Sequence, residues 1–354
     1  MIETRIGTVT KLLSVRPGLV ELEVEVEGRI GKAVAYIMLT GEPVVGDQVL
    51  LNTTATSLKL GSGGYDYVMV NLTDPRRDLA WKGHIMKMRY TPWQCRVLSV
   101  EEEESPHRKI MEQADSLNGC PVLVGTLHSM LAPLCACLAD RGLSSAYVMT
   151  DGASLPMYWS GTVHQLRQAG LLKGTVTTGN AFGGELEAVN IYSGMLAAAA
   201  VFKPDVIIVA MGPGIVGTGT SWGFSGIEQG PILDAVDTLG GIPVAVPRVS
   251  FADTRDRHQG ISHHTLTVLG RVCKSRVKVP LPLLNGAQQK QLQDQIDHHR
   301  IAEKHEVIFR DGRHIDHVFE RYGLKTTTMG RGRAEDYEFF LTLGAAAQVA
   351  ADLV

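Results

Sequence analysis

The amino-acid sequence predicts a doubly wound, mostly parallel α/β fold (Rossmann-like), preceded by a small all-β domain that resembles a barrel. From residue 96 onward, short apolar stretches alternate with segments of helix length, a pattern typical of parallel strands joined by right-handed crossovers. Before residue 76, short stretches alternate apolar and charged residues without a helical period. We therefore expect three parts: a barrel-like domain over 1–75, a basic and aromatic connector over 76–95, and an α/β domain with the active site over 96–354.

The segment Leu19–Val26 illustrates the first part, because its apolar and charged residues fall on opposite faces of an extended chain. Turn residues such as Arg16-Pro-Gly and Glu27-Gly separate it from its neighbours. Small barrels bind oligonucleotides, carry a prosthetic group or pack on another domain. The absence of an aromatic stacking face favours the structural role. The other predicted strands are 5–13, 32–38, 48–52 and 67–72.

The connector interleaves basic residues with aromatic ones, a pattern found in proteins that bind single-stranded nucleic acid. An ordered strap that packs its aromatic residues on a neighbour is the alternative. We favour the strap because the whole chain carries a net charge of −3, so nucleic acid is not the expected partner. The residues concerned are Arg76, Arg77, Trp81, Lys82, Lys87, Arg89, Tyr90 and Trp93.

In the third part, Ser105 is placed to cap a first helix that opens on Pro106. The predicted strands are 96–100, 122–127, 146–150, 174–178, 205–211 and 243–249. The predicted helices between them are 106–117, 129–139, 156–169, 185–202 and 227–239. Further elements are expected at 262–274, 288–304, 306–309, 314–322, 325–328 and 336–353.

Ligands of such sheets bind at the carboxyl ends of the strands. Polar or small residues follow each central strand of the prediction: His128, Asp151, Asn180, a glycine-rich loop and Arg248. This convergence predicts a binding site at one edge of the sheet.

The glycine-rich loop follows the buried apolar run 205–211. Glycines allow several backbone N–H groups to turn toward one point, and a strand, such a loop and a helix commonly cradle an anion. The residues expected to bind the anion are Gly212, Gly214, Gly217, Thr218, Gly219 and Thr220.

Other interpretations of the loop are weaker. Gly212-Pro-Gly-Ile-Val-Gly217 matches the dinucleotide fingerprint, but glycines continue to Gly226 and no acidic residue closes the next strand. A nicotinamide or flavin cofactor is therefore disfavoured. Gly219-Thr-Ser-Trp-Gly223 matches the nucleophile-elbow pattern but lies about eight residues beyond its strand, where the elbow must follow at once.

The segment 248–264 is the second dense group of polar residues. Arg248, Arg255 and Arg257 can each form two parallel hydrogen bonds to a phosphate or carboxylate. His263 and His264 open a predicted helix capped by Ser262, whose positive end keeps imidazole neutral. Together with Asp253, Asp256 and His258 they could hold a divalent metal. A salt-bridge cluster that only orders the loop is the alternative, so the metal content stays open.

Composition excludes several classes of protein. Hydrophobic residues make up 44% and charged residues 20% of the 354, as in ordinary globular proteins. The N-terminus has no apolar core of a signal peptide, and charged residues interrupt the most apolar span, so no membrane association is expected. Five irregularly spaced cysteines indicate reduced thiols and a cytoplasmic location.

Four strings of the chain resemble the bacterial domain-of-unknown-function 3866 family. They lie at 82–94, 211–220, 223–230 and 250–265, the last reading Ser-Phe-Ala-Asp-Thr-Arg-Asp-Arg-His-Gln-Gly-Ile-Ser-His-His-Thr. The resemblance covers nearly the whole chain and implies a cytoplasmic bacterial protein. It supplies no activity, cofactor or catalytic residue.

These observations favour a hydrolase or transferase that acts on a small anionic metabolite, phosphorylated or nucleotide-like. His263 or His258 is the expected general acid or base, oriented by Asp151 or Asp253. The anion would lie between the loop amides and Arg248, Arg255 and Arg257, with His128 and Asn180 nearby. A non-catalytic metabolite sensor that signals through the barrel is the alternative, and nucleic-acid binding is a third. The sequence does not identify the substrate or show whether the chain forms a homo-oligomer.

Overall fold

The structure is a computed structural model that describes residues 1–78 and 82–354. The chain forms two compact units, Met1–Val97 and Leu98–Val354. Trp81 of the predicted connector lies outside the described residues.

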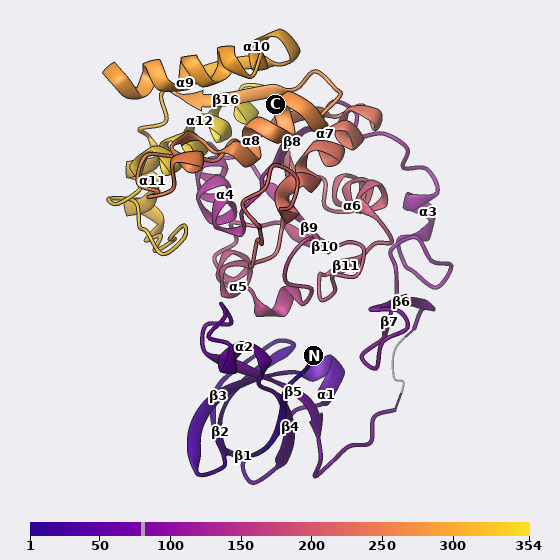
Figure 1. Ribbon diagram of the computed structural model, residues 1–354. Coiled ribbons are helices and arrows are strands. Elements are labelled where there is room, and N and C mark those ends of the chain that lie inside the picture. The colour runs from indigo at the N-terminus through magenta and orange to yellow at the C-terminus, as the bar shows by residue number, and fades with distance from the viewer. Residues whose placement is uncertain (79–81) are drawn as a thin grey trace. The chain divides into compact units, whose positions relative to one another are not determined.

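The first unit contains a closed five-stranded barrel with the strand order β1-β2-β3-β5-β4 (Figure 1). Apolar side chains on alternate residues fill it, among them Val20, Leu22 and Val24, each fully buried. This confirms the predicted all-β domain. The barrel elements are β1 (Thr4–Arg16), β2 (Leu19–Val26), β3 (Arg29–Tyr36), α1 (Ile37–Thr40), β4 (Gln48–Asn52), α2 (Thr54–Ser57) and β5 (Tyr65–Asn71).

The end of the first unit differs from the sequence prediction. Residues 96–100 were expected to form a strand of the parallel sheet. Instead, β7 (Cys95–Val97) pairs antiparallel with β6 (Ile85–Lys87), and only Ser99 forms a single parallel bridge, to Glu187 at the edge of that sheet. A strand of three residues with one fully apolar side chain is too short for its hydrophobic pattern to indicate which strand it pairs with.

The second unit contains an eight-stranded sheet in which every registered pair is parallel. Its order is β11-β10-β9-β12-β8-β13-β16-β17, which confirms the doubly wound α/β prediction. The strands are β8 (Pro121–Val124), β9 (Ser145–Thr150), β10 (Gly174–Thr177), β11 (Leu186–Glu187), β12 (Val206–Met211), β13 (Ile242–Ala245), β16 (Lys278–Pro282) and β17 (Glu306–Arg310).

Helices cover both faces of this sheet, because successive strand residues point to opposite sides. In β12, Val206 and Ile208 belong to one hydrophobic core and Ile207 and Val209 to the other. The first core is closed by α4 (Leu131–Asp140), α5 (Gly161–Gln168), α11 (Ile315–Tyr322) and α12 (Tyr337–Ala351). The second is closed by α6 (Ile191–Ala197), α7 (Gln229–Thr238), α8 (His263–Thr267), α9 (Gly286–His298) and α10 (Ile301–Lys304). Figure 1 shows α4 and α12 on one side of the strands and α6 and α7 on the other.

Several predicted helices are shorter than expected. The segment 106–117 yields only one turn, α3 (Arg108–Met111), and Ser105 does not cap it. The helix expected from residue 156 begins at Gly161, where Ser160 accepts a hydrogen bond from the N–H of Val163. The helix expected from residue 185 begins after Asn190, which forms a capping box with Ser193. In both cases a side-chain cap further along the chain determines the start.

The strand β16 has no counterpart in the sequence prediction. Two prolines, Pro280 and Pro282, lie in it and argue against a sheet interior. It pairs with β17 over five residues but with β13 only at Lys278, so the prolines lie where the ladder on one side has ended. No helix in the described part of the chain is long and apolar enough to cross a membrane.

Candidate functional site

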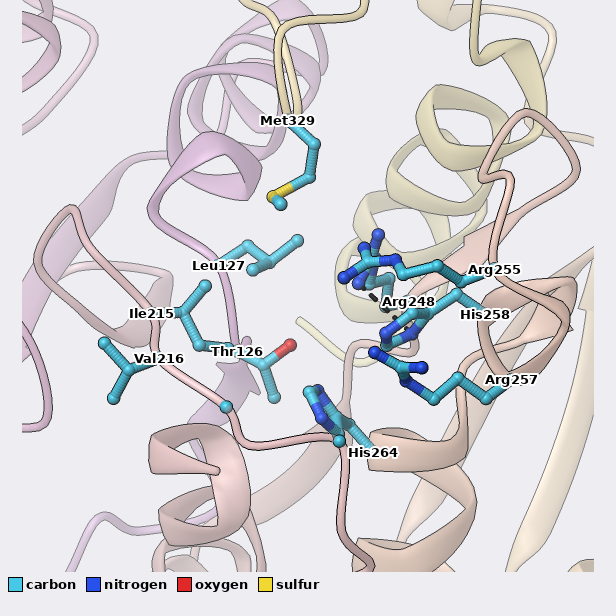
Figure 2. A pocket seen from close by; sticks show the side chains of 12 residues that line it. Thr126, Leu127, Ile215, Val216, Arg248, Arg255, Arg257, His258, His264 and Met329 are labelled. Carbon is cyan, nitrogen blue, oxygen red and sulfur yellow. Dashed lines mark hydrogen bonds between the residues drawn. The ribbon is translucent and has the colours of Figure 1, made fainter. Parts of the chain in front are cut away.

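A pocket lies at the carboxyl edge of the sheet, where the ends of β8, β12 and β13 meet (Figure 2). The chain passes from β8 to β9 on one side and from β13 to β16 on the other, so these neighbouring strands form a topological switch point. The pocket is lined by Thr126, Leu127, Ile215, Val216, Gly217, Gly219, Arg248, Arg255, Arg257, His258, His264 and Met329.

The two sides of the pocket differ in chemistry. Leu127, Ile215 and Val216 lie on one side, and Arg248, Arg255 and Arg257 lie opposite them with His258 (Figure 2). A ligand that fits this arrangement carries negative charge at one end and an apolar or aromatic part at the other.

The glycine-rich loop contributes two of its glycines to the pocket. Backbone N–H groups of Val216 and Thr218 are used within the loop, by Ser225 Oγ (3.2 Å) and the Gly223 carbonyl (2.8 Å). The N–H groups of Gly217 and Gly219 find no partner within 1–78 and 82–354. Gly219 has a φ of 82°, a left-handed conformation that favours glycine. These two amides are therefore the ones available to a ligand.

The other predicted loop residues lie outside the pocket lining. Thr218 and Thr220 hydrogen-bond each other through their hydroxyls (3.0 Å), which holds the loop to itself. Gly212 packs against Ser154, whose carbonyl oxygen would lie 2.8 Å from an added Cβ. Gly214 is exposed with a φ of 105°, so its conformation shapes the turn.

The loop and the 248–264 segment face each other closely. A Cβ added at Gly217 would lie 3.5 Å from Cε1 of His264, and one at Gly219 would lie 3.5 Å from Nη2 of Arg257. Residues that are about 40 positions apart in sequence thus share one site, as the strand-end argument predicts.

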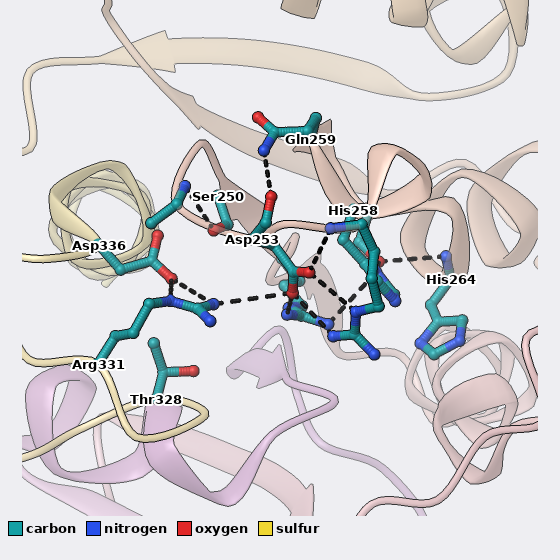
Figure 3. Close-up of polar contacts among 12 residues, drawn as sticks. Ser250, Asp253, His258, Gln259, His264, Thr328, Arg331 and Asp336 are labelled. Carbon is teal, nitrogen blue, oxygen red and sulfur yellow. Dashed lines mark hydrogen bonds and ion pairs between the residues drawn. The ribbon is translucent and has the colours of Figure 1, made fainter.

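An arginine cluster surrounds the buried carboxylate of Asp253 (Figure 3). Its two oxygens accept hydrogen bonds from Arg248 (2.8 Å) and Arg255 (2.8 Å for each of two bonds). The hydrogen bonds of Arg255 hold the pKa of Asp253 well below its usual range. Asp253 therefore positions arginines, and neither oxygen binds a histidine in the described chain.

Arg331 joins the cluster from the segment before α12. It lies 3.7 Å from Asp253 and bonds the buried Asp336 at 2.9 Å. Arg257 lines the pocket and has no ion pair among the residues with described positions. Four guanidinium groups thus lie near two carboxylates, and positive charge is in excess.

Three histidines lie beside the arginines. Ring centroids are 4.9 Å apart for His258 and His263, 5.2 Å for His258 and His264, and 4.2 Å for His263 and His264. His258 is 2% exposed and contacts Ser262 Oγ (2.7 Å) and Arg248 (3.4 Å) through Nδ1. His264 stacks on Phe224 with centroids 3.9 Å apart.

The histidines are neutral near pH 7, as predicted, but the cause differs. Burial, together with the positive charge of Arg248, lowers the pKa of His258 to about 3. Burial, together with His263 and the arginines, lowers the pKa of His264 to about 4. The helix that His263 and His264 open continues through the π-helical turn Val268–Val272, and burial is the main cause of both low pKa values.

Two predicted residues lie at the ends of other strands. Asp151, after β9, accepts a hydrogen bond from the N–H of Asn180 (2.8 Å), after β10. The structure brings these two together but not to the residues that line the pocket. His128 follows β8 but does not line the pocket either: its Nε2 lies 2.7 Å from Ser160 Oγ and its Nδ1 lies 3.3 Å from the hydroxyl of Tyr147. Burial lowers its pKa to about 4.

Sequence reasoning missed Glu228, at the end of the 3₁₀ turn Ser225–Glu228. Its carboxyl is hydrogen-bonded by Thr150 and lies near Asp151. Burial raises its pKa from 4.5 to about 7. The glutamate is visible in the string 223–230, but its burial against β9 depends on strand order, which the string does not contain.

The fold and the site define an α/β protein with an N-terminal barrel and a cationic pocket at the switch point of its sheet. A family model described as protein of unknown function (DUF3866) matches residues 32–347, and the chain belongs to this family. This confirms the resemblance of the four strings. No curated protein matches the chain.

Proposed function

We propose that this chain is an enzyme, a hydrolase or a transferase, that acts on a small anionic metabolite, phosphorylated or nucleotide-like. The observation that carries the proposal is the convergence of Arg248, Arg255 and Arg257 on one side of a switch-point pocket. Arginine forms planar, two-bonded contacts with phosphate and carboxylate groups, which makes it the preferred residue for this recognition.

The apolar side of the pocket refines the substrate class. Leu127, Ile215, Val216 and Met329 offer contact for a base, an aryl ring or a similar apolar part. Inorganic phosphate would leave this side without contact, whereas a nucleotide-like compound would use both sides. The free amides of Gly217 and Gly219 supply further donors for the anionic group.

The reduced state of the cysteines supports the bacterial cytoplasm as the location that we propose. All five cysteines are free thiols, and Cys135 and Cys137 are buried in one core. Free buried thiols are usual where the compartment is reducing.

Arg257 provides the most direct test, because its removal leaves no buried carboxylate without a partner. A panel of nucleotides and other phosphorylated metabolites is titrated calorimetrically into the full chain. Arg257→Ala should weaken binding of the best ligand about tenfold to hundredfold, as loss of a hydrogen bond to a charged group does. Arg313→Ala, an exposed arginine paired with Asp311, is the matched control and should bind as the wild type does.

Turnover separates an enzyme from a sensor. The ligand that binds is incubated with the protein and followed by ³¹P NMR spectroscopy. The incubation is repeated with an added alcohol, which can accept the transferred group in place of water. New phosphorus resonances support the enzyme, and tight binding with an unchanged spectrum assigns the chain to metabolite sensing. Absence of binding across the panel, or equal binding by Arg257→Ala and wild type, would contradict the proposal.

A further inference from the structure

We propose that His258, His263 and His264 form a three-histidine site for a divalent transition metal of the Zn²⁺ type, at the charged end of the pocket. One ring nitrogen of each lies within 4.8 Å of those of the other two. The role of the metal in catalysis rests on the proposed function, but its binding does not.

The local chain explains why the three rings meet. His258 ends the 3₁₀ turn Asp256–His258, and the short hairpin of β14 (Val249–Ser250) and β15 (Gly260–Ile261) returns the chain to Ser262. Ser262 caps α8, so His263 and His264 are its first two residues. A spacing of His-x₄-His-His is thereby folded into one cluster.

The distances suit a metal after small side-chain rotations. Zinc binds histidine nitrogen at about 2.0–2.1 Å, so tetrahedral ligand atoms are about 3.4 Å apart. The present spread is at most 4.8 Å. His263 and His264 are half-buried, and metal binding requires their side chains to rotate so that this difference of about 1.4 Å closes.

Hydrogen bonding leaves the required lone pairs available. Nε2 of His263 is buried and has no partner in the described residues. Nδ1 of His258 lies 2.7 Å from Ser262 Oγ. When Nδ1–H donates to this hydroxyl, the lone pair of Nε2 is free to bind a metal. A ligating histidine generally uses its second nitrogen in this way, since the outer hydrogen bond fixes the orientation of the ring.

The ligand set indicates the type of metal site. Imidazole suits Zn²⁺ and similar ions, whereas Mg²⁺ and Ca²⁺ prefer oxygen ligands. Within the described chain no cysteine, aspartate or glutamate joins the three histidines. Structural zinc sites have four protein ligands, and catalytic ones have three with an open position. His258 and His264 line the pocket, so the open position belongs to the metabolite or to water, which favours a hydrolase over a transferase.

The neighbouring arginines impose a condition on this site. A divalent ion adds to an existing excess of positive charge, because Asp253 and Asp336 balance only part of the four guanidinium groups. An anion in the pocket relieves that repulsion. We therefore expect Zn²⁺ to bind more tightly when inorganic phosphate is present.

The test uses the full chain stripped of metal with a chelator and titrated with Zn²⁺ alone, then with Co²⁺. We expect one ion per chain and, for Co²⁺, the intense visible absorption of a tetrahedral complex. His263→Ala and His264→Ala should each weaken Zn²⁺ binding by about tenfold to hundredfold or more. Removing only a hydrogen-bond partner of a metal-binding histidine already causes a loss of that size. His298→Ala, an exposed histidine of α9, should bind Zn²⁺ as the wild type does.

Circular dichroism shows whether each variant is folded, and only folded variants count. No stoichiometric ion, or Zn²⁺ binding that His263→Ala and His264→Ala leave unchanged, would overturn the metal site. The metabolite panel is also titrated into the metal-free chain. Anion binding without metal binding rejects this inference alone, and metal binding without anion binding rejects the proposed function alone.

Discussion

Glu228 is a half-buried acid whose ionisation lowers the stability of the fold. Its pKa is 4.5 in an ordinary environment and about 7 in the folded chain, because of burial and, to a smaller degree, the charge of Asp151. Tyr147 and Thr150 face it from β9. Since the folded-state pKa is raised, the stabilising contribution of the protonated form is complete below pH 4.5 and is lost as pH rises through about 7.

Glu228→Gln removes this titration while it keeps the shape of the side chain. We expect the variant to gain stability relative to wild type as pH rises, by about 1–3 kcal/mol at about pH 8, with little difference at about pH 5. Urea unfolding at several pH values measures this difference. Glu320→Gln, at an exposed position of α11, should follow the wild-type profile. A difference between Glu228→Gln and wild type that does not change with pH would contradict the assignment.

Residues of the site could be predicted where they lie close together in the sequence. Arg248, Arg255, Arg257 and His258 were identified because they follow a strand end and share one polar segment. Arg331 was not predicted as a residue of the site. It reaches Asp253 across 78 positions, a contact that no local pattern encodes.

At the scale of elements, Ser262 connects helix formation with the histidine cluster. Its side chain accepts from the N–H of His264 and contacts His258 Nδ1 at 2.7 Å. The loss of this cap in Ser262→Ala should cost about 1 kcal/mol in the free energy of unfolding. Loss of the hydrogen bond to His258 should also weaken Zn²⁺ binding about tenfold to hundredfold.

Ser160→Ala is the matched control for this prediction. Ser160 caps α5 through the N–H of Val163 (3.0 Å) and bonds His128, which is not in the cluster. Its stability loss should be similar, and its Zn²⁺ affinity should stay at the wild-type value. Calorimetric titration of both variants gives the comparison. Equal Zn²⁺ affinities for Ser262→Ala and wild type would show that Ser262 does not orient a metal ligand.

Elements with a strong pattern were predicted from sequence, and elements that depend on partners were not. The barrel strands follow from alternation, and β12 follows from its continuous apolar run. The strand β16 was missed because its prolines oppose a strand, and its pairing with β17 compensates. The helix predicted at 106–117 was wrong in start and length, because Ser105 does not cap it and only the turn Arg108–Met111 forms.

At the scale of the whole molecule, strand order determines which strand ends share a pocket. The sequence indicates the doubly wound class but not that β8 lies beside β13, whose first residue is 121 positions further along the chain. This adjacency brings Thr126 and Arg248 together and leaves Asp151 and Asn180 with β9 and β10. Local sequence patterns do not show which strands are neighbours in the sheet. The sequence therefore predicted the strand ends that carry polar residues but not which of them form one pocket.

The pocket also gives the whole chain its main electrostatic feature. The net charge is −3, yet four arginines gather around two carboxylates at one edge of the sheet. A local field of this kind concentrates anions independently of net charge. The proposed function therefore requires that an anion occupies this pocket.

A crystal structure of the full chain grown with tungstate, an anomalous scatterer that mimics phosphate, tests this claim most directly. We predict a tungsten peak whose oxygens lie within hydrogen-bond distance of the guanidinium groups of Arg255 and Arg257 and near the amides of Gly217 and Gly219. An empty pocket at saturating tungstate, or a peak bound only elsewhere on the chain, would contradict the account.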